Sequence, residues 1–454
     1  MINERNFTLD HPSEKPLSAV NGSFETKSSK QTNPDITEVE VDEKVSGSIE
    51  NHFLSDTDGG YGWFVVLGAF LVQLTVFIHR GVMQDYYEQY IFNDVPNASL
   101  KLSFVGTIAS ACMNVGGPFA QVLVSIFGIR PVLIAGTVMI TLGLELASLG
   151  SQIWHLYLTQ GVLFGIGASF IYMAIMGVAP QWFTKRRGLA LGIMASGSGI
   201  GGLIIPNTMN AINSSLGHQW TYRILGFICL FCDIWACILV KPKNPSQKAL
   251  KRFSEMIDLS VLRNTDFLLF CLGSNIGLFG YSVPYFYLPS YATHIGLSDS
   301  QGSSIISVSA AGNFVGRIVV GFLGDRIGKV NSNLIFTAIT GLSALLIWTF
   351  ANSYGSLMAY ALVFGLTSGA YFAQVSPITA SILGMEKFPS GLSLMFLMNL
   401  VSVFGPNIAA VIESDMDTTP FFSYKMFTAV VYLVAAIFIL ILRVRLSRSV
   451  FINV

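Results

Sequence analysis

The stretch at residues 312–329, GNFVGRIVVGFLGDRIGK, carries two arginines in unlike surroundings. Arg326 belongs to a Gly-Asp-Arg-Ile-Gly turn, where glycine allows the tight backbone geometry that joins two closely packed helices. Arg317 lies nine positions earlier, in an apolar segment with no other charge. An arginine at the centre of a membrane helix costs about 2.5–3.5 kcal/mol on insertion scales. Arg317 therefore needs either a structural partner or a function.

The composition around this stretch is that of a membrane protein. Of 454 residues, 52% are hydrophobic and 11% are charged, whereas a soluble domain carries about 25% charged residues. The net charge is zero, so we expect the lipid bilayer as surroundings and no nucleic-acid partner. Cys229-x-x-Cys232 has no second pair or nearby histidine to complete a metal site. Hydrolytic, redox and phosphate-loop motifs are also missing, so we expect no enzyme, no metal and no cofactor.

Hydropathy predicts twelve membrane spans, at about residues 61–83, 103–126, 131–150, 154–180, 188–212, 220–240, 265–292, 303–324, 331–351, 355–383, 389–412 and 422–443. The polar segments around them predict five parts of the chain. These are a disordered cytoplasmic tail at 1–57, a six-helix bundle at 58–240, a cytoplasmic linker at 241–264, a second six-helix bundle at 265–443 and a cytoplasmic C-terminal tail at 444–454.

The lysines and arginines lie in alternate loops, which predicts the orientation. With the N-terminal tail in the cytoplasm, the cytoplasmic loops hold basic groups such as residues 185–187, and the opposite loops carry mainly acidic residues. This positive-inside pattern places both termini in the cytoplasm. It also places Asn97 and Asn213, each in an Asn-x-Ser sequon, on the outer side, where their glycosylation is an open question.

Three motifs carry a resemblance to a known family. The turn Gly321-x-x-Gly324-Asp325-Arg326-x-Gly328-Lys329 resembles the signature between helices 8 and 9 of the major facilitator superfamily. Asp58-Gly-Gly-Tyr-Gly-Trp63 and the run QWFTKRRGLALG at residues 181–192 resemble the monocarboxylate transporter family, especially its fungal branch. The signature residues with an implied conformational role are Asp58, Gly59, Gly60, Trp63, Lys185, Arg186, Arg187, Gly321, Gly324, Asp325, Arg326 and Gly328.

The resemblance covers about residues 58–443. It implies an all-α major facilitator fold, with twelve transmembrane helices in two pseudo-symmetric six-helix bundles. The implied function is secondary active or facilitative transport of a small organic solute by alternating access. A larger substrate such as riboflavin is the alternative, and a non-transporting nutrient sensor is a further one. The plasma membrane is the expected location, with a vacuolar or other secretory-pathway membrane as the alternative.

The resemblance also implies a substrate site around Arg317. Family members typically carry an Asp-x-x-x-Arg element on helix 8, whose arginine binds the substrate carboxylate; the matching residues here are Asn313 and Arg317. Residues four apart share a helix face, so Asn313 is placed to orient the arginine. An arginine that caps a carbonyl or pairs with an acid is the structural alternative.

Helices 7 and 10 are expected to line the same cavity in this fold. Pro284 and Pro377 are expected to break them near it. Tyr285, Tyr371 and Gln374 lie close to these prolines and are the further candidates for contact with the substrate. Aromatic packing is the structural alternative for the two tyrosines.

Two departures from the family leave proton coupling open. Asn313 replaces the aspartate, and an asparagine cannot take up a proton. The family's lysine near the outer end of helix 1 is replaced by Gly81, and the neighbouring His79 is the candidate proton carrier. The expected partners are therefore a small organic solute, taken to be anionic, and a proton only if transport is coupled.

Overall fold

The computed structural model describes residues 58–76, 83, 86–92, 94–96, 98–243, 258–416 and 419–447, and all regular structure in these ranges is helical. The N-terminal tail and most of the linker and C-terminal tail lie outside them, as do His79, Gly81 and Asn97. Contacts divide the chain into two units, Met1–Ser55 and Asp56–Val454. The described helices all belong to the second unit.

Helices occupy the predicted membrane spans. In the described part of the chain, ten helices are long and apolar enough to cross a membrane, and the shorter helix Gly62–Val76 lies in the first predicted span. One of the ten, Tyr354–Asp415, covers two predicted spans. Each predicted span therefore contains helical structure, and the prediction of an all-α membrane protein is confirmed.

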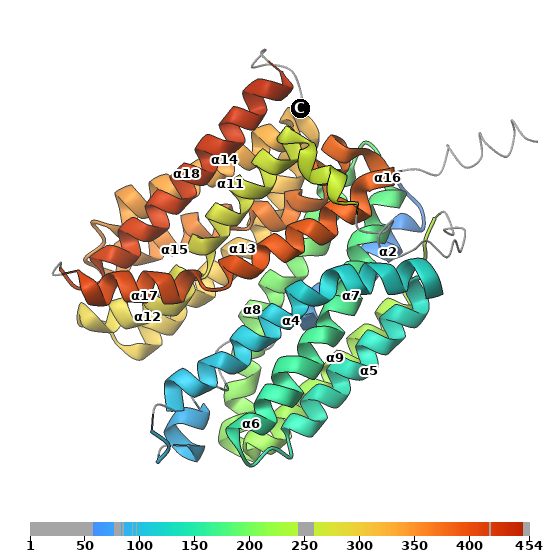
Figure 1. The fold of residues 1–454 in the computed structure, drawn as a ribbon. Helices are drawn as coiled ribbons and strands as arrows, with labels where there is room; N and C mark the ends of the chain where they lie inside the picture. The colour runs from blue at the N-terminus through green and yellow to red at the C-terminus, as the bar shows by residue number, and fades with distance from the viewer. Residues whose placement is uncertain are drawn as a thin grey trace, which may run out of the picture. The chain divides into compact units, whose positions relative to one another are not determined.

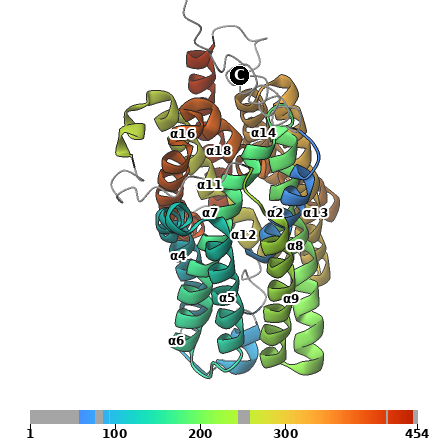
Figure 2. The same cartoon turned by 90° about the vertical axis from the view of Figure 1, so that its right-hand side faces the viewer.

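The first half of the chain forms a group of long helices (Figure 1). They are α2 (Gly62–Val76), α4 (Ala98–Phe127), α5 (Ile129–Ala147), α6 (Ile153–Leu156), α7 (Phe164–Trp182), α8 (Arg187–Leu216) and α9 (His218–Leu239). A π-helical stretch at Tyr157–Leu163 joins α6 to α7, and another lies at Tyr87–Ile91. Figure 2 shows α5 and α9 running side by side, and their residues are in contact.

The second half begins with a short 3₁₀ helix at Leu259–Arg263. The helices that follow are α11 (Thr265–Tyr281), α12 (Val283–His294), α13 (Asp299–Ile327), α14 (Lys329–Ser343), α15 (Tyr354–Ser368), α16 (Ala370–Ser402), α17 (Gly405–Asp415) and α18 (Phe422–Leu446). A π-helical stretch at Ala344–Trp348 extends α14. In Figure 1, α11, α14, α15 and α18 lie together, apart from α5 and α9.

Only one of the two predicted proline breaks is present. Helix 7 is interrupted at Ser282, and Pro284 lies in the first turn of α12, where its missing N–H is not needed. The prediction for Pro377 is wrong, because this proline lies inside α16 without a break. The interruptions of that segment fall instead at Gly369 and at Gly384, whose φ of +73° suits glycine.

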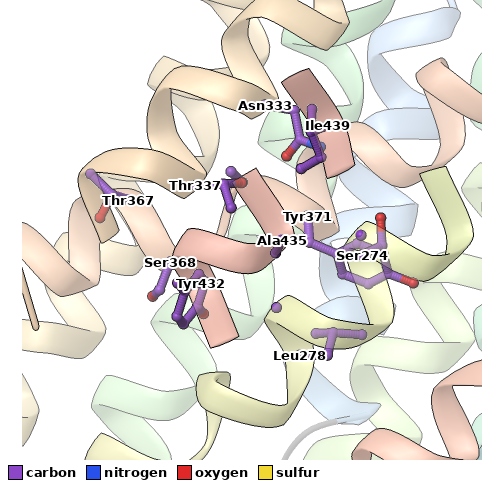
Figure 3. Close-up of a pocket in the computed structure, with 13 residues that line it drawn as sticks. Ser274, Leu278, Asn333, Thr337, Thr367, Ser368, Tyr371, Tyr432, Ala435 and Ile439 are labelled. Atoms are coloured by element: carbon purple, nitrogen blue, oxygen red, sulfur yellow. The ribbon is translucent and has the colours of Figure 1, made fainter. Parts of the chain in front are cut away.

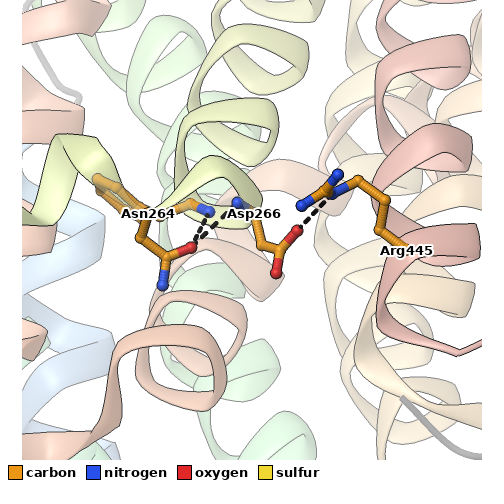
Figure 4. Close-up of polar contacts among 4 residues, drawn as sticks. Asn264, Asp266 and Arg445 are labelled. Carbon is orange, nitrogen blue, oxygen red and sulfur yellow. Dashed lines mark hydrogen bonds and ion pairs between the residues drawn. The ribbon is translucent and has the colours of Figure 1, made fainter.

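Side-chain caps fix the ends of the second group of helices. Asn264 accepts hydrogen bonds from the backbone N–H groups of Asp266 and Phe267, at 3.0 and 3.1 Å, and so caps α11 (Figure 4). The Asp266 carboxylate in turn pairs with Arg445 at 2.8 Å. The start of α11 is thereby tied to the end of α18.

These contacts lie at the end of the molecule where the basic side chains collect, which we call the basic end. Because successive long helices alternate in direction, the same end holds residues from both halves of the chain. They are Arg130, Lys185, Arg186, Arg187, Lys241, Arg326, Lys329, Lys387, Arg443 and Arg445.

Glycines bring α8 and α13 into backbone contact. A Cβ atom at Gly192 would lie 2.5 Å from the carbonyl oxygen of Arg317, and one at Gly199 would lie 2.6 Å from the N atom of Phe314. Small residues allow this approach in a membrane, where van der Waals packing replaces the hydrophobic effect as the force between helices. The long contact between α8 and α13 joins the two halves of the chain.

The contact between α13 and α15 predicts a test of this packing. A Cβ at Gly316 would overlap the backbone carbonyl of Leu366, which cannot move like a side chain. We expect Gly316→Ala to lower the free energy of unfolding by about 1–3 kcal/mol, the usual cost of overpacking. Thermal unfolding of the purified protein in detergent measures this effect.

Gly106 in α4 is the matched control, because nothing lies within 4 Å of a Cβ placed there. Gly106→Ala should leave stability unchanged or raise it by up to about 1 kcal/mol, since alanine favours the helix. Equal unfolding midpoints for the two variants would refute the proposed role of Gly316.

Candidate functional site

Arg317 lies on α13 at its contact with α8, and only 3% of its surface is exposed. Its Nη1 donates to the carbonyl oxygen of Ala195 at 2.7 Å and to the hydroxyl of Ser198. Its Nη2 donates to the Tyr281 hydroxyl at 3.4 Å. The guanidinium carbon lies 4.5 Å from the centre of the Phe372 ring, a favourable cation–π distance. The cation is therefore held by neutral groups from three other segments.

Asn313 lies one turn before Arg317 and is equally buried. Its amide nitrogen has no hydrogen-bond partner among the described residues, and the same holds for Nε of Arg317. Both nitrogens lie 3.0 Å from the position of a Cβ on Gly369, so they are close neighbours. Two unpaired buried N–H donors cost about 1–3 kcal/mol each. Together they form a place where an acceptor would gain binding energy.

Tyr285 lies beside this cluster rather than on the guanidinium. Its hydroxyl accepts a hydrogen bond from Ser309 at 3.4 Å. Its ring centre lies 5.5 Å from that of Tyr281, whose own ring is 5.0 Å from Phe372. Tyr285 thus belongs to an aromatic group that surrounds the arginine.

Tyr371 and Gln374 make their hydrogen bonds to groups other than Arg317, although the Tyr371 ring lies 5.2 Å from that of Phe372. The Tyr371 hydroxyl accepts a hydrogen bond from Asn399 at 2.6 Å. Gln374 is fully buried and donates to the carbonyl oxygen of Val320 at 3.0 Å. The absence of a side chain at Gly324 makes room for the Gln374 amide. Gln374 therefore ties α16 to α13, and the structure does not bring it to the guanidinium.

A small cavity lies beside Tyr371 within the second group of helices (Figure 3). Its volume is about 20 Å³, and Asn333 and Ser274 line it with buried polar atoms that lack partners among the described residues. A space of this size holds about one water molecule. It is too small for an organic solute, whose sites usually measure about 300–1,000 Å³.

Two carboxylates hold the start of α8 at the basic end. Asp325 of α13 accepts hydrogen bonds from the backbone N–H groups of Gly188 and Leu189, at 2.7 and 2.8 Å. An anion is favoured there by the exposed amides and the dipole of the helix. Arg326, next to it, is exposed and stacks on the Phe322 ring at 4.4 Å. Gly328 ends α13 with a φ of +96°.

The second carboxylate is Asp58, just before α2. It accepts hydrogen bonds from the backbone N–H groups of Thr184, Lys185 and Arg186 at 2.8, 3.0 and 2.9 Å, and from the Thr184 hydroxyl at 2.6 Å. Burial by itself raises the pKa of Asp58, but these bonds, led by that from Arg186, outweigh it and lower the pKa to about 2. The signature residues Asp58 and Lys185–Arg187 therefore form one local structure. Trp63 belongs to it through its ring, 5.0 Å from that of Phe183.

The sequence did not single out Ala195, Ser198 or Phe372, three of the groups on which Arg317 depends. Ser198 and Ala195 lie in the Gly-rich run of α8, where serine and alanine are expected as packing residues. Phe372 follows Tyr371 and looks like ordinary core. Among the described residues, no group of three or more His, Cys, Asp or Glu side chains is placed to hold a metal ion.

Comparison with known families gives a match over most of the chain. The sequence model of the Major Facilitator Superfamily matches residues 65–406 and, in a second match, residues 270–451. An MFS-type transporter of Gibberella moniliformis is 30% identical, over 79% of this chain and 85% of the relative.

Two further fungal relatives are named for what they export. The agnestins efflux protein of Paecilomyces divaricatus is 28% identical, over 94% of this chain and 97% of the relative. The fujikurins efflux protein of Gibberella fujikuroi is 28% identical, over 95% of this chain and 92% of the relative.

Among solved structures, the human organic anion transporter MFSD10 superposes with a TM-score of 0.62. The superposition covers 84% of this chain and 97% of that one, and at 14% identity it shows the fold alone.

The hydrogen bonds of Asp58 predict a dependence of stability on pH. Because the folded pKa is below the unfolded value of about 3.9, the carboxylate stabilises the fold above about pH 4 and loses this effect as the pH falls towards about 2. Asp58→Asn keeps one acceptor oxygen but removes the charge and the second acceptor, so it should lower the free energy of unfolding by about 1–3 kcal/mol, the range for a lost hydrogen-bond partner. The substitution should also remove the loss of stability that the Asp58 carboxylate causes between about pH 4 and pH 2. Thermal unfolding over a pH series measures both effects.

Asp415→Asn serves as the control, since Asp415 is exposed and makes no hydrogen bond among those found in the described residues. The assignment fails if the wild type and the Asp58→Asn variant lose stability alike on acidification.

Proposed function

Because the chain belongs to the Major Facilitator Superfamily and is a multi-pass membrane transporter, we propose that its solute is an organic anion whose acid group binds Arg317. On this proposal the protein is of the monocarboxylate-transporter type. The basic end faces the cytoplasm, both termini lie there, and the protein acts in the plasma membrane. The positive-inside pattern of the loops supports this orientation.

The observation that carries the proposal is the surroundings of Arg317. The ion pairs among the described residues, Lys387 with Asp258 and Arg445 with Asp266, do not include it. A buried charge without an opposite charge is expensive, and intramembrane cations usually face a functional site. The unpaired donors on Arg317 and Asn313 add two further contacts suited to a carboxylate.

The same geometry suggests how binding would act on the helices. Arg317 belongs to α13, while Ala195 and Ser198, which accept from its Nη1, belong to α8. A carboxylate that takes the guanidinium competes with these neutral acceptors and so loosens a contact between the two halves of the chain. Alternating access needs such a coupling between occupancy and the movement of the halves.

Export is the direction we propose. Two relatives that match nearly the whole chain are named as efflux proteins. Riboflavin or a similar larger substrate is the second candidate, and a nutrient sensor that moves no solute is the third. An untargeted comparison of solutes inside and outside null and overexpressing cells separates the three.

Substitution of Arg317 tests the site. Arg317→Gln should abolish net movement of the anionic solute, because it removes the charge that the acid group needs. Arg317→Lys keeps the charge but loses the planar fork, so we expect it to retain only a small fraction of transport. Transport of the accumulating acid by membrane vesicles measures both, with surface expression checked for each variant.

Arg263→Gln is the control, since this exposed arginine lies in the 3₁₀ helix away from α8 and α13. Normal transport by the Arg317→Gln variant would disprove the assignment.

Asn313 gives a separate prediction about protons. We expect solute affinity to be equal at acidic and neutral pH, because the Asn313 amide, unlike an aspartate, carries no ionisable proton. Asn313→Asp introduces a carboxyl that competes for Arg317 when ionised, so affinity should fall as the pH rises. Solute binding to the purified protein at both pH values tests this.

A wild-type protein whose affinity changes steeply with pH would contradict the expectation. Accumulation that a protonophore abolishes, with affinity unchanged, would place coupling at another group, for which His79 is the candidate.

A further inference from the structure

We propose that the groove between α5 and α9 binds an anionic phospholipid, with its acyl chain in the groove and its headgroup phosphate at Arg130 and Lys241. The groove has a volume of about 560 Å³. It is lined by Arg130, Ile134, Thr137 and Val138 of α5, by Leu230, Ile234, Cys237 and Ile238 of α9, and by Lys241. This site is independent of the solute site at Arg317.

The walls of the groove are apolar and open. Ile134, Val138, Ile234 and Ile238 are each between 47% and 54% exposed. The one hydroxyl, on Thr137, donates to the carbonyl oxygen of Leu133 at 2.9 Å and lies 3.8 Å from the Cys237 sulfur. The groove therefore offers a hydrocarbon chain van der Waals contact without leaving an unpaired donor inside it.

Two cations stand at one mouth of this groove. Arg130 lies in the first turn of α5, and Lys241 follows the end of α9, so both belong to the basic end. Neither takes part in an ion pair among the described residues. The N-terminus of α5 adds its own positive potential beside Arg130. Basic sites between helices at the membrane surface attract anionic lipid headgroups.

The combination favours a lipid over a free anion. Inorganic phosphate would use the two cations but leave the apolar walls exposed, and a zwitterionic lipid would bring a headgroup without net negative charge to Arg130 and Lys241. An anionic phospholipid satisfies both parts of the site at once.

The headgroup site adjoins the structure around Asp58. The carbonyl oxygen of Lys241 accepts from the Trp182 indole at 2.9 Å, and the Lys241 ammonium lies 4.7 Å from the Tyr61 ring. Tyr61 in turn donates to the carbonyl oxygen of Leu239 at 3.1 Å. A bound headgroup would thus hold the segments that carry Asp58 and Thr184.

Lipid retention by the purified full-length protein tests the proposal. Native mass spectrometry would compare bound phosphatidylserine with bound phosphatidylcholine, and inorganic phosphate would be added as a competitor. We expect the wild type to prefer phosphatidylserine. In the double variant Arg130→Gln with Lys241→Gln, the ratio of bound phosphatidylserine to bound phosphatidylcholine should fall about fivefold for each cation removed. Arg263→Gln with Lys387→Gln removes the same amount of charge at two residues that do not line the groove, and should keep the preference.

A second pair of variants tests the apolar part. Ile234→Trp fills the groove and should reduce retention of either lipid, whereas Leu142→Trp changes an equally exposed residue, 49% against 47%, that does not line it. The proposal is overturned if the two charge variants lose the preference equally, or if phosphate displaces the lipid. It is also overturned if Ile234→Trp and Leu142→Trp retain lipid alike.

Discussion

The contact between α8 and α13 is the constraint on which the rest of the described structure depends. Glycines on both helices let the backbones touch, and the charged side chain of Arg317 at this contact is only 3% exposed. Arg317 must therefore take its hydrogen bonds from α8 and from the aromatic group of Tyr281 and Phe372. The close packing of α8 against α13 thus buries the guanidinium of Arg317, and its hydrogen bonds are made to other groups of the protein.

At the basic end, half-buried anions are held by neutral groups, as the Arg317 cation is held at the contact between α8 and α13. There the carboxylates of Asp58 and Asp325 accept the backbone N–H groups around the start of α8, one from each half of the chain. Helix α8 is therefore held by anions at its N-terminus and contributes neutral acceptors to a cation further along. A movement of α8 relative to α13 has to change the bonds of Asp325 and of Arg317 together.

The sequence predicted the helices well because membrane spans follow from apolar length, which is a local property. The turn at Gly321–Lys329 and the charge of Arg317 were also visible, since glycine and arginine are rare in such surroundings. The partners of Arg317 were not, because Ala195 contributes only a backbone carbonyl and Ser198 resembles a packing residue. The error at Pro377 has a similar origin: a membrane helix tolerates proline, and the breaks fell at Gly369 and Gly384, where φ or close approach required glycine.

On the proposed function, the neutrality of the groups that hold Arg317 has a consequence for discrimination between solutes. Hydrogen bonds between a cation and an anion are roughly twice as strong as those between neutral groups. An ester or amide of the right shape would exchange one neutral acceptor for another and gain little over Ala195 and Ser198. A carboxylate would replace these neutral hydrogen bonds with stronger, charge-assisted ones, and would gain the difference in binding free energy. A solute would therefore need a stronger hydrogen-bond acceptor than the Ala195 carbonyl and the Ser198 hydroxyl in order to displace them from Arg317. Uncharged analogues would be excluded for this reason, without any steric barrier.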